Sequence, residues 1–142
     1  MTTVLLLLFS MAQPVPTTLD QVRTIANLEH RANLALDYAL AAERKAEDAY
    51  SKSGEPGVTA TLGEMLAGVE LAKSSLDASG KKPYSSPKYF KYAEQKSREL
   101  LKRLESLEQK MDADERKVIS APKDRIDAIH DGWLQGIMGK KT

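Results

Sequence analysis

The chain has 142 residues, of which 42% are hydrophobic and 29% charged, and its formal net charge is +1. This length and composition fit one globular domain with a modest core. Because the chain contains no cysteine, disulfides and thiolate metal sites are excluded. The near-neutral charge argues against a general nucleic-acid binder, so no specific nucleic-acid binding is expected.

The first residues have the layout of a signal peptide. An unbroken apolar run, Val4–Phe9, is followed by the small residues Ser10 and Ala12, and then by prolines that break any continuing helix. The run is too short for a membrane-spanning helix, which needs about 20 apolar residues. We therefore expect residues 1–12 to be a cleaved signal peptide, residues 13–19 to be a flexible segment, and the mature protein to be periplasmic or secreted without a transmembrane helix. No Lys or Arg precedes the apolar run.

A long helix is predicted from about Asp20 to Lys52, between a possible Thr18 cap and the terminator "SKSGEPG". Apolar residues recur at alternating steps of three and four and form a narrow seam of mostly alanine side chains. The bulkier Leu36, Leu40 and Tyr50 flank this seam. Its members are Ile25, Leu28, Ala32, Ala35, Ala39, Ala42, Ala46 and Ala49.

Two more helices follow with clear boundaries. The first runs from about Val58 to Ser79 and stops at Gly80, and Gly63 and Gly68 within it indicate close packing against a neighbour or a bend. The second starts after Ser86, with Pro87 at its first position, and its three-four rhythm continues to Met111.

The polar stretch "DADERK" interrupts this rhythm. It predicts a break, a kink or a restart in which Asp112 caps a helix and Glu115 completes a capping box. Pro122 is expected to open the last helix, from about Pro122 to Met138, with Ile126, Ile129, Trp133 and Ile137 on its buried face.

The expected fold is all-α: an antiparallel up-down bundle of three long helices plus a shorter C-terminal helix, four-helix bundle-like, over residues 20–139 with a tail at 140–142. The alanine seam suits either a helix of the same chain or a second copy, because a heptad pattern does not distinguish the two. A homo-oligomer through the seam therefore remains open.

The segment at residues 81–92, "KKPYSSPKYFKY", interleaves aromatic residues with lysines. Stacking groups beside cations can engage a glycan, single-stranded nucleic acid, an anionic membrane or an acidic partner. The competing interpretation is that Phe90 and one tyrosine cover the bundle end while the lysines are solvated. The candidate interaction surface consists of Lys81, Lys82, Tyr84, Lys88, Tyr89, Lys91 and Tyr92.

The segment "DRIDAIHDGW" places Asp127 three residues before His130, so that both side chains can share one helix face. The pair is a weak candidate for metal binding, and the favoured interpretation is a structural histidine bonded to Asp127 or Asp131. No motif indicates a catalytic residue or a cofactor.

These observations favour a non-enzymatic, exported helical bundle that acts through a protein or envelope surface. A small-ligand or metal-binding bundle is the alternative. A cytosolic scaffold protein is the further alternative if the N-terminus is retained.

Overall fold

The computed structural model describes residues 18–139, and these residues form helices without any strand. The expected all-α bundle is confirmed. The predicted signal peptide, residues 13–17 and the tail at 140–142 lie outside the described residues. The helices are α1 (Leu19–Arg23), α2 (Leu28–Ser53), α3 (Val58–Ala78), α4 (Pro87–Gln109) and α5 (Lys117–Ile137), with a 3-10 turn at Glu55–Gly57.

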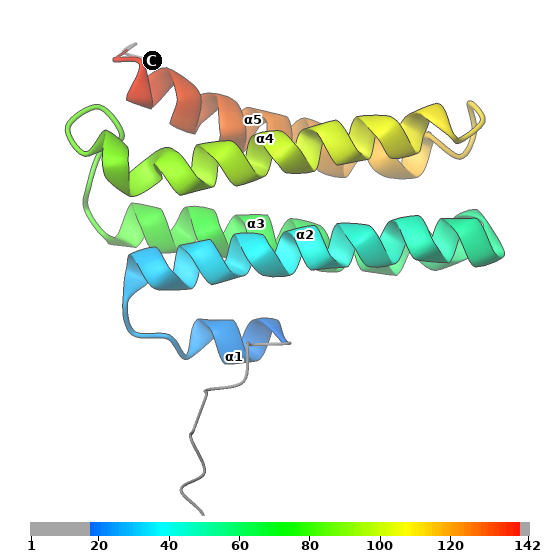
Figure 1. Ribbon diagram of the computed structural model, residues 1–142, viewed down its shortest axis with the longest axis horizontal. Coiled ribbons are helices and arrows are strands. Elements are labelled where there is room, and N and C mark those ends of the chain that lie inside the picture. Colours follow the sequence, from blue (N-terminus) through cyan, green and yellow to red (C-terminus); the bar gives the residue numbers. More distant parts are fainter. Residues whose placement is uncertain (1–17, 140–142) are drawn as a thin grey trace, which may run out of the picture.

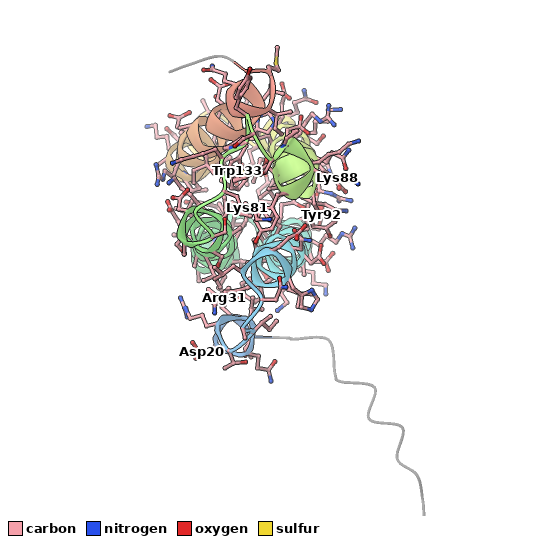
Figure 2. All side chains as sticks on the ribbon, turned by 90° about the vertical axis from the view of Figure 1, so that its left-hand side faces the viewer. Asp20, Arg31, Lys81, Lys88, Tyr92 and Trp133 are labelled. Carbon is pink, nitrogen blue, oxygen red and sulfur yellow. The ribbon has the colours of Figure 1, made fainter. Side chains whose placement is uncertain are left out.

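The four long helices form two layers (Figure 1). One layer pairs α2 with α3, the other pairs α4 with α5, and they stack through α2 against α4 and α3 against α5. In the end view of Figure 2, α1 lies on the outer side of the α2–α3 layer. Among residues 18–139, no helix has both the length and the hydropathy of a membrane span. The largest fully buried apolar side chains include Leu36, Leu62, Met65, Leu76, Leu100, Leu104, Leu107, Ile119 and Ile126.

The single helix expected at 20–52 is wrong, because the chain breaks at residues 24–27 and reverses. The Asn27 side chain caps α2 by accepting a hydrogen bond from the His30 N–H at 2.9 Å. The Arg31 Nε donates to the Ile25 carbonyl at 2.8 Å and so satisfies a backbone acceptor in the break. This reversal lays α1 against α2 and α3 and buries Val22 completely.

Close packing between α2 and α3 occurs at Gly68 but not at Gly63. A Cβ atom on Gly68 would lie 2.8 Å from the Ala35 carbonyl oxygen and 3.1 Å from the Ala39 Cβ. A Cβ on Gly63 would meet no atom within 4 Å. The buried alanine seam of α2 therefore serves packing within this chain, where it meets α3 at the glycine.

The chain breaks after α4, which is one of the three outcomes expected there, but Asp112 does not cap the next helix and Pro122 does not open it. Asp112 and Glu115 exchange hydrogen bonds between side chain and backbone at 3.0 and 2.9 Å in the pattern of a capping box, but they lie in the turn before the helix. The N-cap of the helix is Arg116, which makes no side-chain cap hydrogen bond. The helix that follows starts at Lys117, and Pro122 lies inside it. This early start buries Ile119, and in return the helix loses one backbone donor at Pro122. With 21 residues, α5 is as long as α3 and not shorter.

Candidate ligand pocket and basic groove

Some of the aromatic residues in segment 81–92 pack against the core, and others are exposed to solvent. Phe90 is buried, and Tyr89 packs beside it with ring centroids 5.9 Å apart. Tyr84 is 72% exposed, although its ring lies against Gly139. Phe90 therefore belongs to the core, and Tyr89 packs against it, whereas Tyr84 is exposed.

Tyr92 joins the two layers of the bundle. Its hydroxyl donates a hydrogen bond to the Asp37 carboxylate on α2, and the Lys96 ammonium lies 5.3 Å from the centre of its ring. Burial, together with this carboxylate acceptor, raises the pKa of Tyr92 above its ordinary value. Tyr92 is thus a neutral structural group rather than a free stacking surface.

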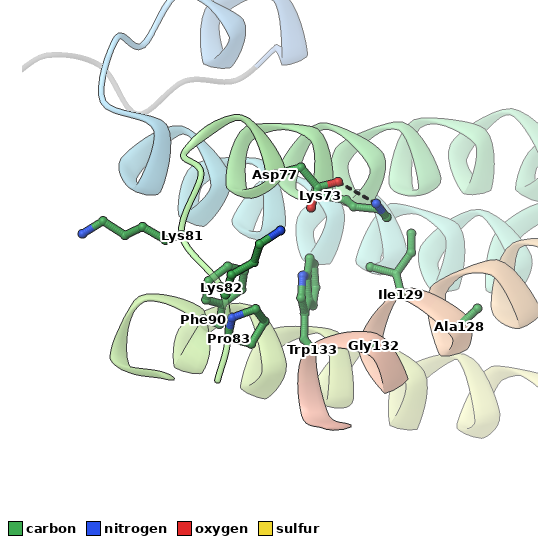
Figure 3. Close-up of a pocket in the computed structure, with 10 residues that line it drawn as sticks. All are labelled: Lys73, Asp77, Lys81, Lys82, Pro83, Phe90, Ala128, Ile129, Gly132 and Trp133. Carbon is green, nitrogen blue, oxygen red and sulfur yellow. Dashed lines mark hydrogen bonds and ion pairs between the residues drawn. The ribbon is translucent and has the colours of Figure 1, made fainter. Parts of the chain in front are cut away.

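The loop at 79–86 forms one wall of a pocket whose other walls are α3, α5 and Phe90 of α4 (Figure 3). Pro83 packs on Gly136 of α5, where a Cβ atom would approach the proline ring to 2.7 Å, so glycine permits this close contact. The pocket has a volume of about 320 Å³. We call it the indole pocket, and its lining residues are Lys73, Asp77, Lys81, Lys82, Pro83, Phe90, Ala128, Ile129, Gly132 and Trp133.

Three cations and one carboxylate surround the apolar floor of the indole pocket. The Lys73 ammonium and the Asp77 carboxylate form an ion pair at 2.6 Å on α3. Lys81 points away, and its ammonium lies 4.7 Å from the centre of the Tyr89 ring (Figure 3). Lys82 extends into the space between the loop and α3, beside Trp133, and pairs with no carboxylate of the described residues (Figure 3). The pocket therefore carries an excess of positive charge.

A second hollow, of about 530 Å³, lies between α4 and the end of α5. We call it the basic groove. Lys88 and Lys91 are exposed on it and form no ion pair within residues 18–139, whereas Arg98 lies 3.6 Å from the Glu94 carboxylate. Its full lining consists of Pro87, Lys88, Lys91, Glu94, Gln95, Arg98, Leu134 and Ile137.

His130 faces α4 rather than the acidic residues of its own helix. Its Nε2 lies 3.6 Å from a Glu94 carboxylate oxygen, and both side chains are buried. Asp127 is exposed, and Asp131 accepts a hydrogen bond from Gln135. The expected bond from His130 to Asp127 or Asp131 is therefore wrong, and the buried Nε2 of His130 has no hydrogen-bond partner among the described residues. Within residues 18–139, no group of three or more His, Asp or Glu side chains is arranged to hold a metal ion.

A buried carboxylate on α2 was not predicted from the sequence. Glu43 is fully buried, and neither of its oxygens has a hydrogen-bond partner among the described residues. Burial raises the pKa of Glu43 to about 7, and the nearby Glu47 adds to this shift while Arg103 of α4 opposes it. A signal was present in the sequence, because Glu43 follows Leu40 by three positions on the bulky flank of the alanine seam.

The pocket residues outside segment 81–92 were also missed as a site. Trp133 and Ile129 were assigned only to a buried face, and Lys73, Asp77 and Gly132 gave no motif. Their juxtaposition depends on how the loop folds between α3 and α5, which no local pattern encodes.

Comparison with known protein families, with curated proteins and with solved structures finds no match to this chain. The function must therefore be argued from the chain's own residues and their geometry.

Proposed function

We propose that this protein is a non-enzymatic, exported binding module whose basic groove recognises an acidic amphipathic segment of a partner protein. The observation that carries this proposal is the combination of unpaired cations with an apolar floor in one hollow. Lys88 and Lys91 supply the cations, and Leu134 and Ile137 supply the apolar surface.

Charge and shape together favour this class of partner. Residues 81–110 carry a net charge of +5, although the whole chain carries only +1, so the positive charge is local. Opposite charge across an interface accelerates association and suppresses wrong partners. A polyanion without apolar groups would use the lysines but would leave Leu134 and Ile137 uncovered. An amphipathic helix with acidic flanks uses both features.

The test is the binding of a fluorescent helical peptide of about 20 residues, with leucine on one face and glutamate on the other. We expect it to bind the protein, and the triple variant Lys88→Glu, Lys91→Glu and Arg98→Glu to weaken binding by about tenfold or more. Fluorescence anisotropy at two salt concentrations gives the affinity and its electrostatic component. Added salt should weaken binding because exposed charges are screened.

A matched control separates the groove from net charge alone. Lys45, Lys52 and Lys102 are also exposed, and reversing all three changes the net charge equally. This control is expected to retain most of the affinity. Equal losses in the two triple variants would contradict the proposal, as would equal affinity for a peptide in which lysine replaces glutamate.

Export is a separate part of the proposal and rests on the apolar run in residues 1–12. We expect the full-length chain, expressed in a bacterium, to lose these residues and to be recovered outside the cytoplasm. Intact mass together with cell fractionation checks this. An intact N-terminus in the cytosolic fraction would contradict export and favour the cytosolic scaffold alternative.

A further inference from the structure

We propose that the indole pocket binds a small aromatic carboxylate. This site is distinct from the basic groove, because the two hollows share no lining residue. The inference goes beyond the proposed function, and either can fail without the other.

The apolar part of the pocket selects for a ring. Phe90, Ile129 and Trp133 line it, and all three belong to the buried core, so they form a fixed floor rather than a mobile surface. The volume of about 320 Å³ lies near the lower end of the range for small-molecule sites. Gly132 also lines the pocket, and a Cβ atom there would meet nothing within 4 Å, so the site has room for a larger side chain.

The polar part of the pocket selects for an anion. Lys73 is already paired with Asp77, and Lys81 lies over the Tyr89 ring. Lys82 is the pocket cation that has no ion-pair partner among residues 18–139, and it lies beside Trp133 (Figure 3). A carboxylate that reaches Lys82 forms a charge-assisted hydrogen bond while the ring of the same molecule lies against the apolar floor.

Neither feature alone would define the ligand. A neutral ring would leave the Lys82 ammonium without a counter-charge, and a small inorganic anion would leave the apolar floor uncovered. A cationic ring would be repelled by the excess of lysine over Asp77. The geometry thus points to a ring and a carboxylate in one molecule.

The experiment is a titration of the full chain with hydrocinnamate and with three related probes. Hydrocinnamamide lacks the charge, phenylpropylamine reverses it, and propanoate lacks the ring. Trp133 is the only tryptophan, so selective excitation reports on the pocket itself, and calorimetry gives the affinity independently. We expect hydrocinnamate to bind at least about tenfold more tightly than each of the other three.

Two variants test the two halves of the site. Gly132→Leu is expected to fill the pocket, and Lys82→Glu is expected to remove its free cation. Each substitution should weaken the binding of hydrocinnamate by about tenfold or more. Gly63→Leu is the matched control for the first, because a Cβ at Gly63 also meets nothing within 4 Å. Lys45→Glu is the matched charge control for the second, at an exposed site on α2. Circular-dichroism melts verify that each variant is folded.

The expected result is that both controls keep the affinity within about twofold of the parent chain. The proposal is overturned if hydrocinnamate does not bind at millimolar concentration, or if its amide binds equally well. It is also overturned if folded Gly132→Leu protein retains full affinity. Binding of the glutamate–leucine peptide by the same Gly132→Leu protein would show that the basic groove is intact, whichever result the titration gives.

Discussion

Replacing Glu43 with glutamine is expected to raise the free energy of unfolding by about 3 kcal/mol at pH 8 and to change it little at pH 4. The cause is the buried position of this carboxylate, which has no hydrogen-bond partner among the described residues. Glutamine has the shape of the protonated acid but cannot ionise. Chemical denaturation of both proteins across this pH range measures the difference.

The sign of the effect follows from the direction of the pKa shift. Burial raises the pKa of Glu43 to about 7 from an ordinary value of 4.5, so the folded state holds this proton more tightly than the unfolded state does. Between these two values the unfolded chain releases its proton first, and the stability of the parent protein falls as the pH rises. Glu43→Gln removes that contribution, and the gain is complete above the folded pKa.

Glu105→Gln provides the control, because Glu105 is exposed on α4 and forms no ion pair within residues 18–139. This substitution removes an exposed carboxylate instead of a buried one. The free energy of unfolding should therefore change by no more than about 0.5 kcal/mol at both pH values. A Glu43→Gln effect that is equal at pH 4 and pH 8, or that is destabilising at pH 8, would contradict the argument.

Gly68→Ala and Gly63→Ala are expected to change stability in opposite directions. At Gly68 the new methyl group would meet the Ala35 carbonyl oxygen at 2.8 Å, and this atom belongs to the backbone of α2 and cannot rotate away. We expect a loss of about 1–3 kcal/mol. At Gly63 there is open space, so alanine should add about 0.5–1 kcal/mol through its higher helix propensity.

Thermal and denaturant melts of the two variants check this pair, and each serves as the control for the other. The same sign for both substitutions would mean that helix propensity alone governs them. In that case the close approach of α2 and α3 at Gly68 would not contribute to specificity.

The helix boundaries that sequence predicted well are those marked by local chemistry. Gly80 ends α3 at a positive φ of 72°, a conformation that glycine adopts readily, and Pro87 opens α4 where its missing N–H costs nothing. For α3 and α4 the determinant therefore lies within a few residues of the boundary. The hydrogen bonds between Asp112 and Glu115 were also predictable, because the two residues are three apart, but they lie in the turn before α5 and do not mark its start.

The predictions that failed depend on contacts between distant residues. The apolar pattern continues from residue 25 into α2, so it indicated no reason to end the helix before Asn27. The burial of Val22, as α1 packs against α2 and α3, favours the reversal together with the hydrogen bond from Arg31 to the Ile25 carbonyl. The contact between His130 and Glu94 could not be predicted either, because Glu94 belongs to another helix. The indole pocket is a further case, since its walls come from three helices and a loop.

The pairing of neighbouring helices has a consequence for the order of folding. Residues 54–57 join α2 to α3, and α4 and α5 are likewise consecutive, so each layer is a helical hairpin built from contacts that are local in the chain. Proteins of such low contact order fold rapidly, within about microseconds to milliseconds. The hydrogen bonds from Tyr92 to Asp37 and from Arg125 to Glu70 span 55 residues each and form only when the hairpins dock. Glu43 is buried at this same junction, and the loss of hydration outweighs the attraction of Arg103, so ionisation of its carboxylate should retard docking while leaving the formation of each hairpin unaffected.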